Sequence, residues 1–126
     1  MRARGKNLLI DTDQGTLHTH MLMRGSWHIY RPHDRWHKPR RFADIIIETT
    51  PWTAVGMSIP LARFLRREEQ SAQLRALGPD LLADDVDLDE AIQRLRRDPS
   101  QPLGVALMRQ SNVAGIGNVY KSELCF

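Results

Sequence analysis

Cysteines and long apolar runs are scarce in this chain of 126 residues. The single cysteine, Cys125, excludes an internal disulfide framework and a zinc site built from several cysteines. No apolar run approaches the ~20 residues of a membrane span, and the start "MRARGKNLLI" lacks the long apolar stretch of a signal peptide. These absences predict a protein of the reducing cytoplasm with no membrane partner, and nothing in the sequence signals an oligomeric state.

The composition is that of a globular protein. Hydrophobic residues make up 41% of the chain and charged residues 26%, which is enough for a core and argues against disorder. The length suits one domain, or two small subdomains that share the chain.

The net charge of +3 is unevenly distributed. Residues 1–75 hold 13 Lys and Arg against 7 Asp and Glu, whereas residues 76–126 hold 5 against 8. The densest basic stretch, residues 24–41, combines six Lys and Arg with three His and two Trp. Basic residues interleaved with aromatic ones suit a polyanion, because phosphates release counterions when they are neutralised. A solvated basic loop is the plainer alternative.

Residues 7–67 have the pattern of strands and turns. "NLLID" precedes the turn signal "TDQG", "SWHIY" and "ADIIIETT" have β character, and prolines and glycines interrupt the stretch that follows. No helical period survives there. The pattern predicts a small antiparallel sandwich or barrel over residues 1–70.

A linker over residues 71–86 and helices over residues 87–126 are predicted next. Asp87 and Glu90 have capping-box spacing, and the apolar residues that follow them form one helical face. The residues of this face are Leu88, Ala91, Ile92 and Leu95. A second helix is expected to start near Pro102, and a third at Asn118.

The closing segment "QSNVAGIGNVYKSE" places two glycines before the third helix. Gly115 and Gly117 permit tight backbone conformations and close approach to another surface. A helix N-terminus presents unpaired N–H groups and a partial positive charge, which suit phosphate. Asn118 is expected to cap this helix and to donate its amide to an anion. An ordinary helix–helix turn is the alternative.

This segment closely resembles the helix-two-turns-helix signature of the formamidopyrimidine-DNA glycosylase and endonuclease VIII family. "RGKNLLI", "HTHMLMRGSW" and "LGPDLL" resemble three further family segments in the same order, so that the resemblance covers residues 4–126. The region from "GPDLLADD" to "GIGNVY" is most similar to actinobacterial endonuclease VIII-like members. The resemblance implies an α+β fold: a partial antiparallel β-sandwich followed by a helix-two-turns-helix DNA-binding domain.

The resemblance also implies base-excision repair, in which a glycosylase/AP lyase acts on double-stranded DNA with a damaged base or an abasic site. Lys6 matches the family's catalytic, phosphate-contacting lysine, Met23 the loop that fills the space of a flipped nucleotide, and Asn118 the phosphate-binding asparagine. A surface lysine and a core methionine are the alternatives for Lys6 and Met23. The expected DNA-binding residues are Leu22, Met23, Arg24, Arg40, Arg41, Gln110, Gly115, Gly117, Asn118 and Lys121.

One tempting match is rejected on spacing. "KPRRFAD", residues 38–44, resembles the loop that wedges against the base opposite the lesion, but it follows Met23 too closely. "MSIPLARFL", residues 57–65, occupies the expected place. Arg40 and Arg41 therefore remain candidates for phosphate contact only, and Phe42 is left out of the wedge role.

Two departures from the family concern the chemistry. Members begin Met-Pro-Glu, where the proline amine forms a Schiff base, whereas this chain begins "MRARGK". Most members also carry a four-cysteine zinc finger, so no cofactor is expected here and zinc only in a full-length member. The resemblance thus predicts an internal piece of a longer enzyme without efficient glycosylase activity. A catalytically silent DNA-binding module or degraded paralogue is the alternative, and a remnant without a stable fold the third possibility.

Overall fold

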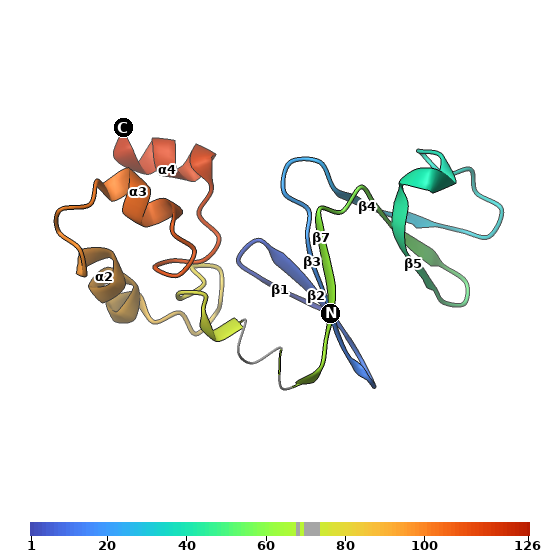
Figure 1. The fold of residues 1–126 in the computed structure, drawn as a ribbon, viewed down its shortest axis with the longest axis horizontal. Helices are drawn as coiled ribbons and strands as arrows, with labels where there is room; N and C mark the ends of the chain where they lie inside the picture. Colours follow the sequence, from blue (N-terminus) through green and yellow to red (C-terminus); the bar gives the residue numbers. More distant parts are fainter. Residues whose placement is uncertain (68, 70–73) are drawn as a thin grey trace.

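The computed structural model describes residues 1–67, 69 and 74–126. Strands come first along the chain and helices last, as expected for the predicted α+β class (Figure 1). The strands are β1 (Arg2–Arg4), β2 (Asn7–Thr12), β3 (Gly15–His20), β4 (Ser26–Tyr30), β5 (Ala43–Glu48), β6 (Thr53–Met57) and β7 (Leu61–Leu65). The helices are the short 3-10 turn η1 (Arg40–Phe42) and the α-helices α2 (Leu88–Arg96), α3 (Leu103–Met108) and α4 (Asn118–Cys125).

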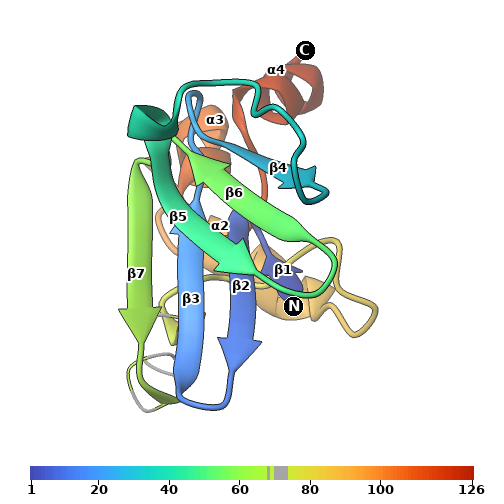
Figure 2. The same ribbon diagram turned by 90° about the vertical axis from the view of Figure 1, so that its right-hand side faces the viewer.

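The strands form two antiparallel sheets that lie against each other. One sheet has the order β1-β2-β3-β7 and the other β4-β6-β5. The "TDQG" segment makes the predicted turn, because Thr12 pairs with Gly15 where β2 meets β3. β5 and β6 cross in front of β2 and β3 in Figure 2, which confirms a partial sandwich.

Separate apolar clusters stabilise the sheets and the helices. Tyr30, Val55 and Met57 form the cluster of the β4-β6-β5 sheet, on which Trp36 and Ile46 pack. The cluster of the helices consists of Ala91, Leu107, Val113 and Ile116, with Leu95 packed against it. Full burial of a Val, Leu, Ile or Met side chain in these clusters contributes ~1.5–3 kcal/mol to folding.

The start of α2 confirms the predicted capping residue. Asp87 is the N-cap, and its carboxylate accepts a hydrogen bond of 2.8 Å from Glu90 N. The side chain of Glu90 instead binds Arg94 at 2.6 Å, one turn further along the helix. The predicted apolar face is only half covered, since Ala91 is buried while Leu88 and Ile92 remain exposed.

The other two helices begin close to the predicted positions. Pro102 is the N-cap of α3, one residue before its first helical residue. Asn118 is the first residue of α4, as predicted, but the prediction that it caps this helix is wrong. Gly117 occupies the N-cap position, and no side chain makes a capping hydrogen bond there. Asn118 has already entered the helix, so its side chain lies beyond the position from which an N-cap accepts.

The described residues include no helix long and apolar enough to cross a membrane. The predicted boundary between sandwich and linker, at residues 70 and 71, lies outside the described residues. The predicted linker is described only from Leu74 onward.

Candidate nucleic-acid interface

The segment between α3 and α4 is a hairpin stiffened by two of its own side chains. Gln110 donates from Nε2 to Met108 O at 3.1 Å and to Ile116 O at 3.0 Å, and its Oε1 accepts from Gly115 N at 3.0 Å. Asn112 Nδ2 donates to Ala106 O at 3.0 Å. Gly115 has a φ of 99°, which side-chain-bearing residues rarely adopt. Gln110 is thus used to shape the hairpin, and its expected contact with DNA stays a prediction.

The turn between β1 and β2 lies directly against this hairpin. Gly5 has a φ of 54°, and a Cβ on it would come within 3.0 Å of Ala114 Cβ and 3.1 Å of Gly115 N. Only glycine therefore allows the turn to approach so closely. Two segments more than 100 residues apart in sequence meet here (Figure 1).

Lys6 follows Gly5, and its ammonium lies at the start of α4. A Cβ built on Gly117 would be 3.5 Å from Lys6 Nζ and 3.6 Å from Lys6 Cε. Lys6 forms no ion pair with any described residue. The phosphate contact expected of Lys6 stays a prediction.

The first turn of α4 adds a second source of positive potential. The hydrogen bond of 2.8 Å from Lys121 N to Gly117 O closes the turn. The amides of residues 118–120 precede this first intrahelical donor and have no acceptor within the helix. Asn118 is exposed beside them. A cation at a helix N-terminus is unfavourable by ~0.3–1 kcal/mol, and an anion bound between Lys6 and α4 would reverse the sign of that interaction.

Two predicted residues of this region have other neighbours. Lys121 packs its stem on α3, because a Cβ on Gly104 would lie 3.2 Å from Lys121 Cδ. Gly115 lies on the side of the turn of Gly5, with its own Cβ position 3.7 Å from Gly5 Cα. Their contact with DNA remains a prediction.

The loop between β3 and β4 projects Met23 into solvent. The backbone closes it with a hydrogen bond of 2.8 Å from Gly25 N to Met21 O. Met23 is 97% exposed and Leu22 62% exposed, with a φ of 48° at Leu22. The alternative of a core methionine is therefore excluded, and an apolar tip remains that is free to insert between bases.

His20, which the sequence analysis did not single out, anchors this loop close to Lys6. Its Nδ1 accepts a hydrogen bond of 3.0 Å from Leu22 N. Burial, followed by the charges of Lys6 and His18, lowers the pKa of His20 below its ordinary value of 6.5. The neutral ring that accepts this bond is thereby favoured. The period-two spacing of His18 and His20, which puts both rings on one face of a strand, was the available signal.

The segment favoured by spacing for the opposite-strand loop contacts the Met23 loop. A Cβ on Gly25 would lie 3.2 Å from Ile59 Cδ1. Ile59 N donates to Asp44 Oδ2 at 2.6 Å, and Ser58 N to Phe42 O at 2.9 Å. The two loops thus share one edge of the sandwich, although their role toward DNA stays a prediction.

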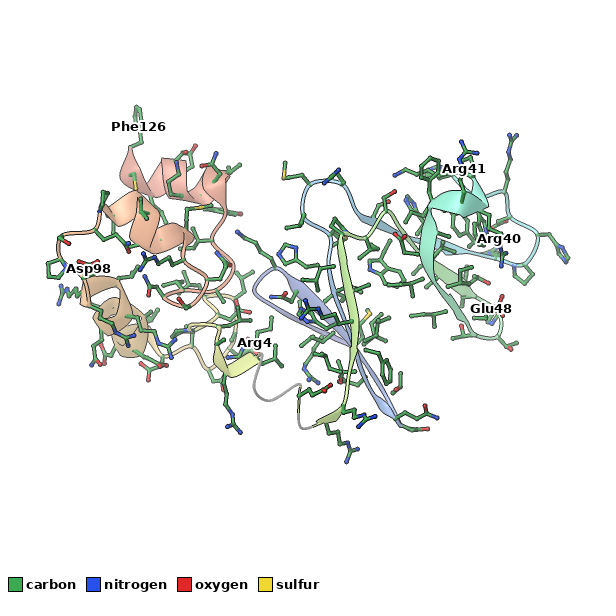
Figure 3. The ribbon with its side chains drawn as sticks, in the orientation of Figure 1. Arg4, Arg40, Arg41, Glu48, Asp98 and Phe126 are labelled. Carbon is green, nitrogen blue, oxygen red and sulfur yellow. The ribbon has the colours of Figure 1, made fainter. Side chains whose placement is uncertain are left out.

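Arg40 and Arg41 are not brought to the hairpin. Figure 3 labels them at the opposite end of the molecule from Phe126, which ends the chain after α4. Their guanidinium groups lie over aromatic rings, 5.5 Å from the ring of Trp36 and 4.9 Å from that of Phe42 respectively. In Figures 1 and 2, which share a vertical axis, α4, the loop at residues 21–25 and η1 all lie along the upper edge.

No group of three or more metal-ligating side chains occurs among the described residues. The zinc finger implied for full-length relatives needs four cysteines, so a chain with one cysteine does not fit that group.

Comparison with known proteins turned up similar sequences, although no family model matches. The chain is 47% identical over 125 residues to the "Probable endonuclease 8 2" of Streptomyces coelicolor, covering 98% of this chain and 45% of that protein. It is 39% identical over 125 residues to the "Endonuclease 8 2" of Mycobacterium tuberculosis, covering 98% and 49%. A DNA-(apurinic or apyrimidinic site) lyase of Mycolicibacterium smegmatis is 37% identical over 124 residues, with coverage of 98% and 48%.

Solved structures agree on the fold. A formamidopyrimidine-DNA glycosylase of Lactococcus lactis, bound to DNA that contains an AP site, superposes with a TM-score of 0.77 at 19% identity, covering 98% of this chain and 47% of that one. MutM in complex with DNA containing carbocyclic 8-oxo-G gives a TM-score of 0.78 at 19% identity, covering 98% and 48%.

These superpositions show that the chain has the fold of the corresponding part of formamidopyrimidine-DNA glycosylase and MutM. The chain is a homologue of endonuclease VIII and formamidopyrimidine-DNA glycosylase proteins over nearly its whole length, as the resemblance implied. It spans about half the length of the curated relatives that it matches.

Proposed function

We propose that this chain is the DNA-gripping part of a base-excision repair glycosylase/AP lyase and binds duplex DNA at a damaged base or an abasic site. The observation that carries the proposal is the place of Lys6, whose ammonium lies against Gly117 at the N-terminus of α4 without an ion-pair partner among the described residues. A backbone phosphate supplies the negative charge that this arrangement lacks.

The other predicted residues have complementary roles in this proposal. Asn118 and the first amides of α4 donate to the same phosphate, which positions the DNA without reading its sequence. Met23 fills the space that the flipped or missing base leaves, and so offsets part of the few kcal/mol that unstacking costs. Leu22 and Arg24 flank it, and Arg40 and Arg41 contact phosphates further along the duplex.

The test is the binding of the 126-residue chain to an abasic-site duplex at several salt concentrations. Affinity should fall steeply with salt, with a slope of about 0.9 in the log–log plot per neutralised phosphate. Lys6→Gln should lower the slope by about one such step, whereas Arg75→Gln, a matched change of one exposed cation on the linker, should not. A flat salt dependence of the unchanged chain would refute the proposal.

A second candidate is a catalytically silent DNA-binding module. Such a module would bind DNA through the same residues and carry out no reaction there. Both candidates share the phosphate site and a cytoplasmic, nucleoid-associated location, and both leave zinc to the longer relatives. They differ in whether the chain forms a covalent adduct with DNA.

A further inference from the structure

Asp80 joins three segments that are far apart in the sequence. Its Oδ2 accepts a hydrogen bond of 2.5 Å from Gly5 N, and its Oδ1 accepts one of 3.2 Å from Leu82 N. Its backbone forms a parallel bridge with Ala114 of the hairpin. The carboxylate thus reaches from the segment before α2 to the β1–β2 turn, across 75 positions of sequence.

The hydrogen bond to Gly5 fixes the residue next to Lys6. Gly5 has a left-handed φ of 54° and lies in the turn that the paired residues Arg4 and Asn7 close. A carboxylate that accepts from a backbone N–H makes a stronger bond than a neutral acceptor does. The turn, held by this hydrogen bond, places the Lys6 ammonium beside Gly117 at the start of α4.

The backbone around Asp80 secures its own position. Ala114 N donates to Pro79 O at 2.9 Å, and Gly78 N donates to Gln110 O at 2.8 Å. A Cβ on Gly78 would collide with the carbonyl group of Asn112, so this close contact also requires glycine. Asp80 is therefore held close to the hairpin through the backbone of the two residues before it.

We propose that Asp80 is a positioning residue, which acts on DNA only through Lys6 by locking the β1–β2 turn to the hairpin. This inference rests on the proposed function, since it assigns the residue that sets the geometry of the phosphate site. A carboxylate this close to a phosphate site repels the ligand through space. The charge of Asp80 should therefore weaken DNA binding, whereas its hydrogen bond to Gly5 should strengthen it.

The two possible roles of Asp80 predict opposite changes in DNA affinity when the charge is removed, so one variant distinguishes them. Asp80→Asn keeps the size of the side chain but leaves one uncharged oxygen for two N–H donors. The hydrogen bond to Gly5 is then either lost or weakened to one with a neutral acceptor. If Asp80 positions Lys6, the affinity for abasic duplex should fall about tenfold, the ratio expected for one charge-assisted bond, and the salt slope should fall by about 0.9. If Asp80 acted only through its charge, affinity should rise instead, and that result would overturn the inference.

Two further variants separate positioning from general effects. Asp84→Asn removes a neighbouring exposed acidic charge and should leave affinity unchanged or slightly higher. In a Lys6→Gln background, Asp80→Asn should cause no further loss, because the two residues act on one contact. Additive losses would show that Asp80 does not act through Lys6. Asp80→Glu keeps the charge but displaces it, so it should also weaken binding and covers the case in which Asp80→Asn fails to fold.

A readout without DNA keeps this inference distinct from the proposed function. In ¹⁵N-labelled protein, Asp80→Asn should shift the amide resonance of Gly5 and abolish the proton contacts between the Lys6 side chain and Gly117, while resonances of Leu9 and Val55 in the sandwich stay in place. If the unchanged chain does not bind abasic duplex, the proposed function fails. The spectra then still test whether Asp80 positions Lys6. Unchanged Lys6–Gly117 contacts in the variant would refute the positioning role.

Discussion

Lys6 Nζ lies 3.5 Å from the point where a Cβ on Gly117 would stand. The absence of a side chain at Gly117 therefore leaves the path between the ammonium and the first turn of α4 open. The two groups are both positive, so their proximity is stabilised only when an anion joins them. This relationship is the basis of the proposal that a DNA phosphate binds between Lys6 and α4.

Replacing Asn118 separates the phosphate site from helix capping. Because Gly117 is the N-cap of α4, Asn118→Ala should leave the free energy of unfolding within about 0.5 kcal/mol of the unchanged chain. The affinity for abasic duplex should nevertheless fall about tenfold, since a donor to a charged phosphate is lost. Urea unfolding and fluorescence anisotropy measure the two quantities.

Asp87→Ala provides the opposite pattern as a control. Asp87 caps α2 through its bond to Glu90 N, so its loss should cost ~0.5–2 kcal/mol of stability without changing DNA affinity at a temperature where the chain is folded. If Asn118→Ala binds DNA as well as the unchanged chain, the hairpin is only a structural turn.

Met23 should matter for damaged DNA and not for stability. Since this side chain is 97% exposed, Met23→Ala should leave the melting temperature unchanged. Its affinity for abasic duplex should fall roughly threefold to tenfold because the apolar tip no longer fills the gap, with a smaller effect on undamaged duplex. Met57→Ala is the matched control: Met57 is fully buried, and its truncation should cost ~2–5 kcal/mol. Equal losses on the two duplexes would contradict a wedge.

His20 should make the chain less stable in mild acid. Its folded-state pKa is lowered below 6.5, first by burial and then by Lys6 and His18. The unfolded chain therefore binds more protons as the pH falls below 6.5, and stability should decline until the pH has passed the folded-state pKa. His20→Gln should flatten this part of the profile in urea unfolding measured between about pH 5 and pH 8.

The same titration should loosen the loop at residues 21–25. A protonated Nδ1 cannot accept from Leu22 N, so amide exchange at Leu22 should accelerate as the pH falls, after correction for the intrinsic rate. Leu9, buried in β2, should show no such acceleration. A pH profile that survives in His20→Gln would assign the effect to another group.

Local signals in the sequence were sufficient to predict most of the strands and helices and the N-cap of α2. The turn at "TDQG", the strands from residue 7 onward and the N-cap Asp87 each depend on residues a few positions apart, and these were predicted. The strand β1 (Arg2–Arg4) was not. The start of α4 was also predicted, yet its cap was misplaced by one residue. The reason is that Gly117 and Asn118 both suit an N-cap, and only the backbone path decides between them.

Long-range contacts were beyond prediction from one sequence. The bond from Gly5 N to Asp80 joins residues 75 positions apart, and no periodicity reports such a pairing. Leu88 and Ile92 belong to the same predicted apolar face as Ala91 and Leu95. Periodicity shows which way such a face points, but it does not show how much of the face other residues bury. The roles of Lys6, Met23 and Asn118 came from family resemblance, and the structure adds where these residues lie relative to one another.

The last prediction concerns covalent chemistry, for which the chain has two candidate amines. The N-terminal amine of Met1 precedes β1, whereas Lys6 follows it, so the strand, roughly 10 Å long for its three residues, separates the two. Met1 is 85% exposed, and nothing orients its amine toward the α4 site. Loss of orientation alone forfeits much of the ~7–11 kcal/mol that proximity contributes, so base excision by the 126-residue chain should be inefficient.

An abasic site presents its sugar aldehyde without prior excision, and Lys6 is the amine next to the phosphate site. Attack of the neutral Lys6 amine on C1′ releases water and gives an imine, which borohydride reduces to a stable adduct. We expect slow trapping on abasic duplex and none on a duplex with an oxidised base. Lys6→Ala should abolish the adduct, whereas Lys38→Ala, which also removes a cation, should not. Efficient trapping on the oxidised-base duplex would overturn the prediction, and an adduct that persists in Lys6→Ala would assign the reaction to another amine.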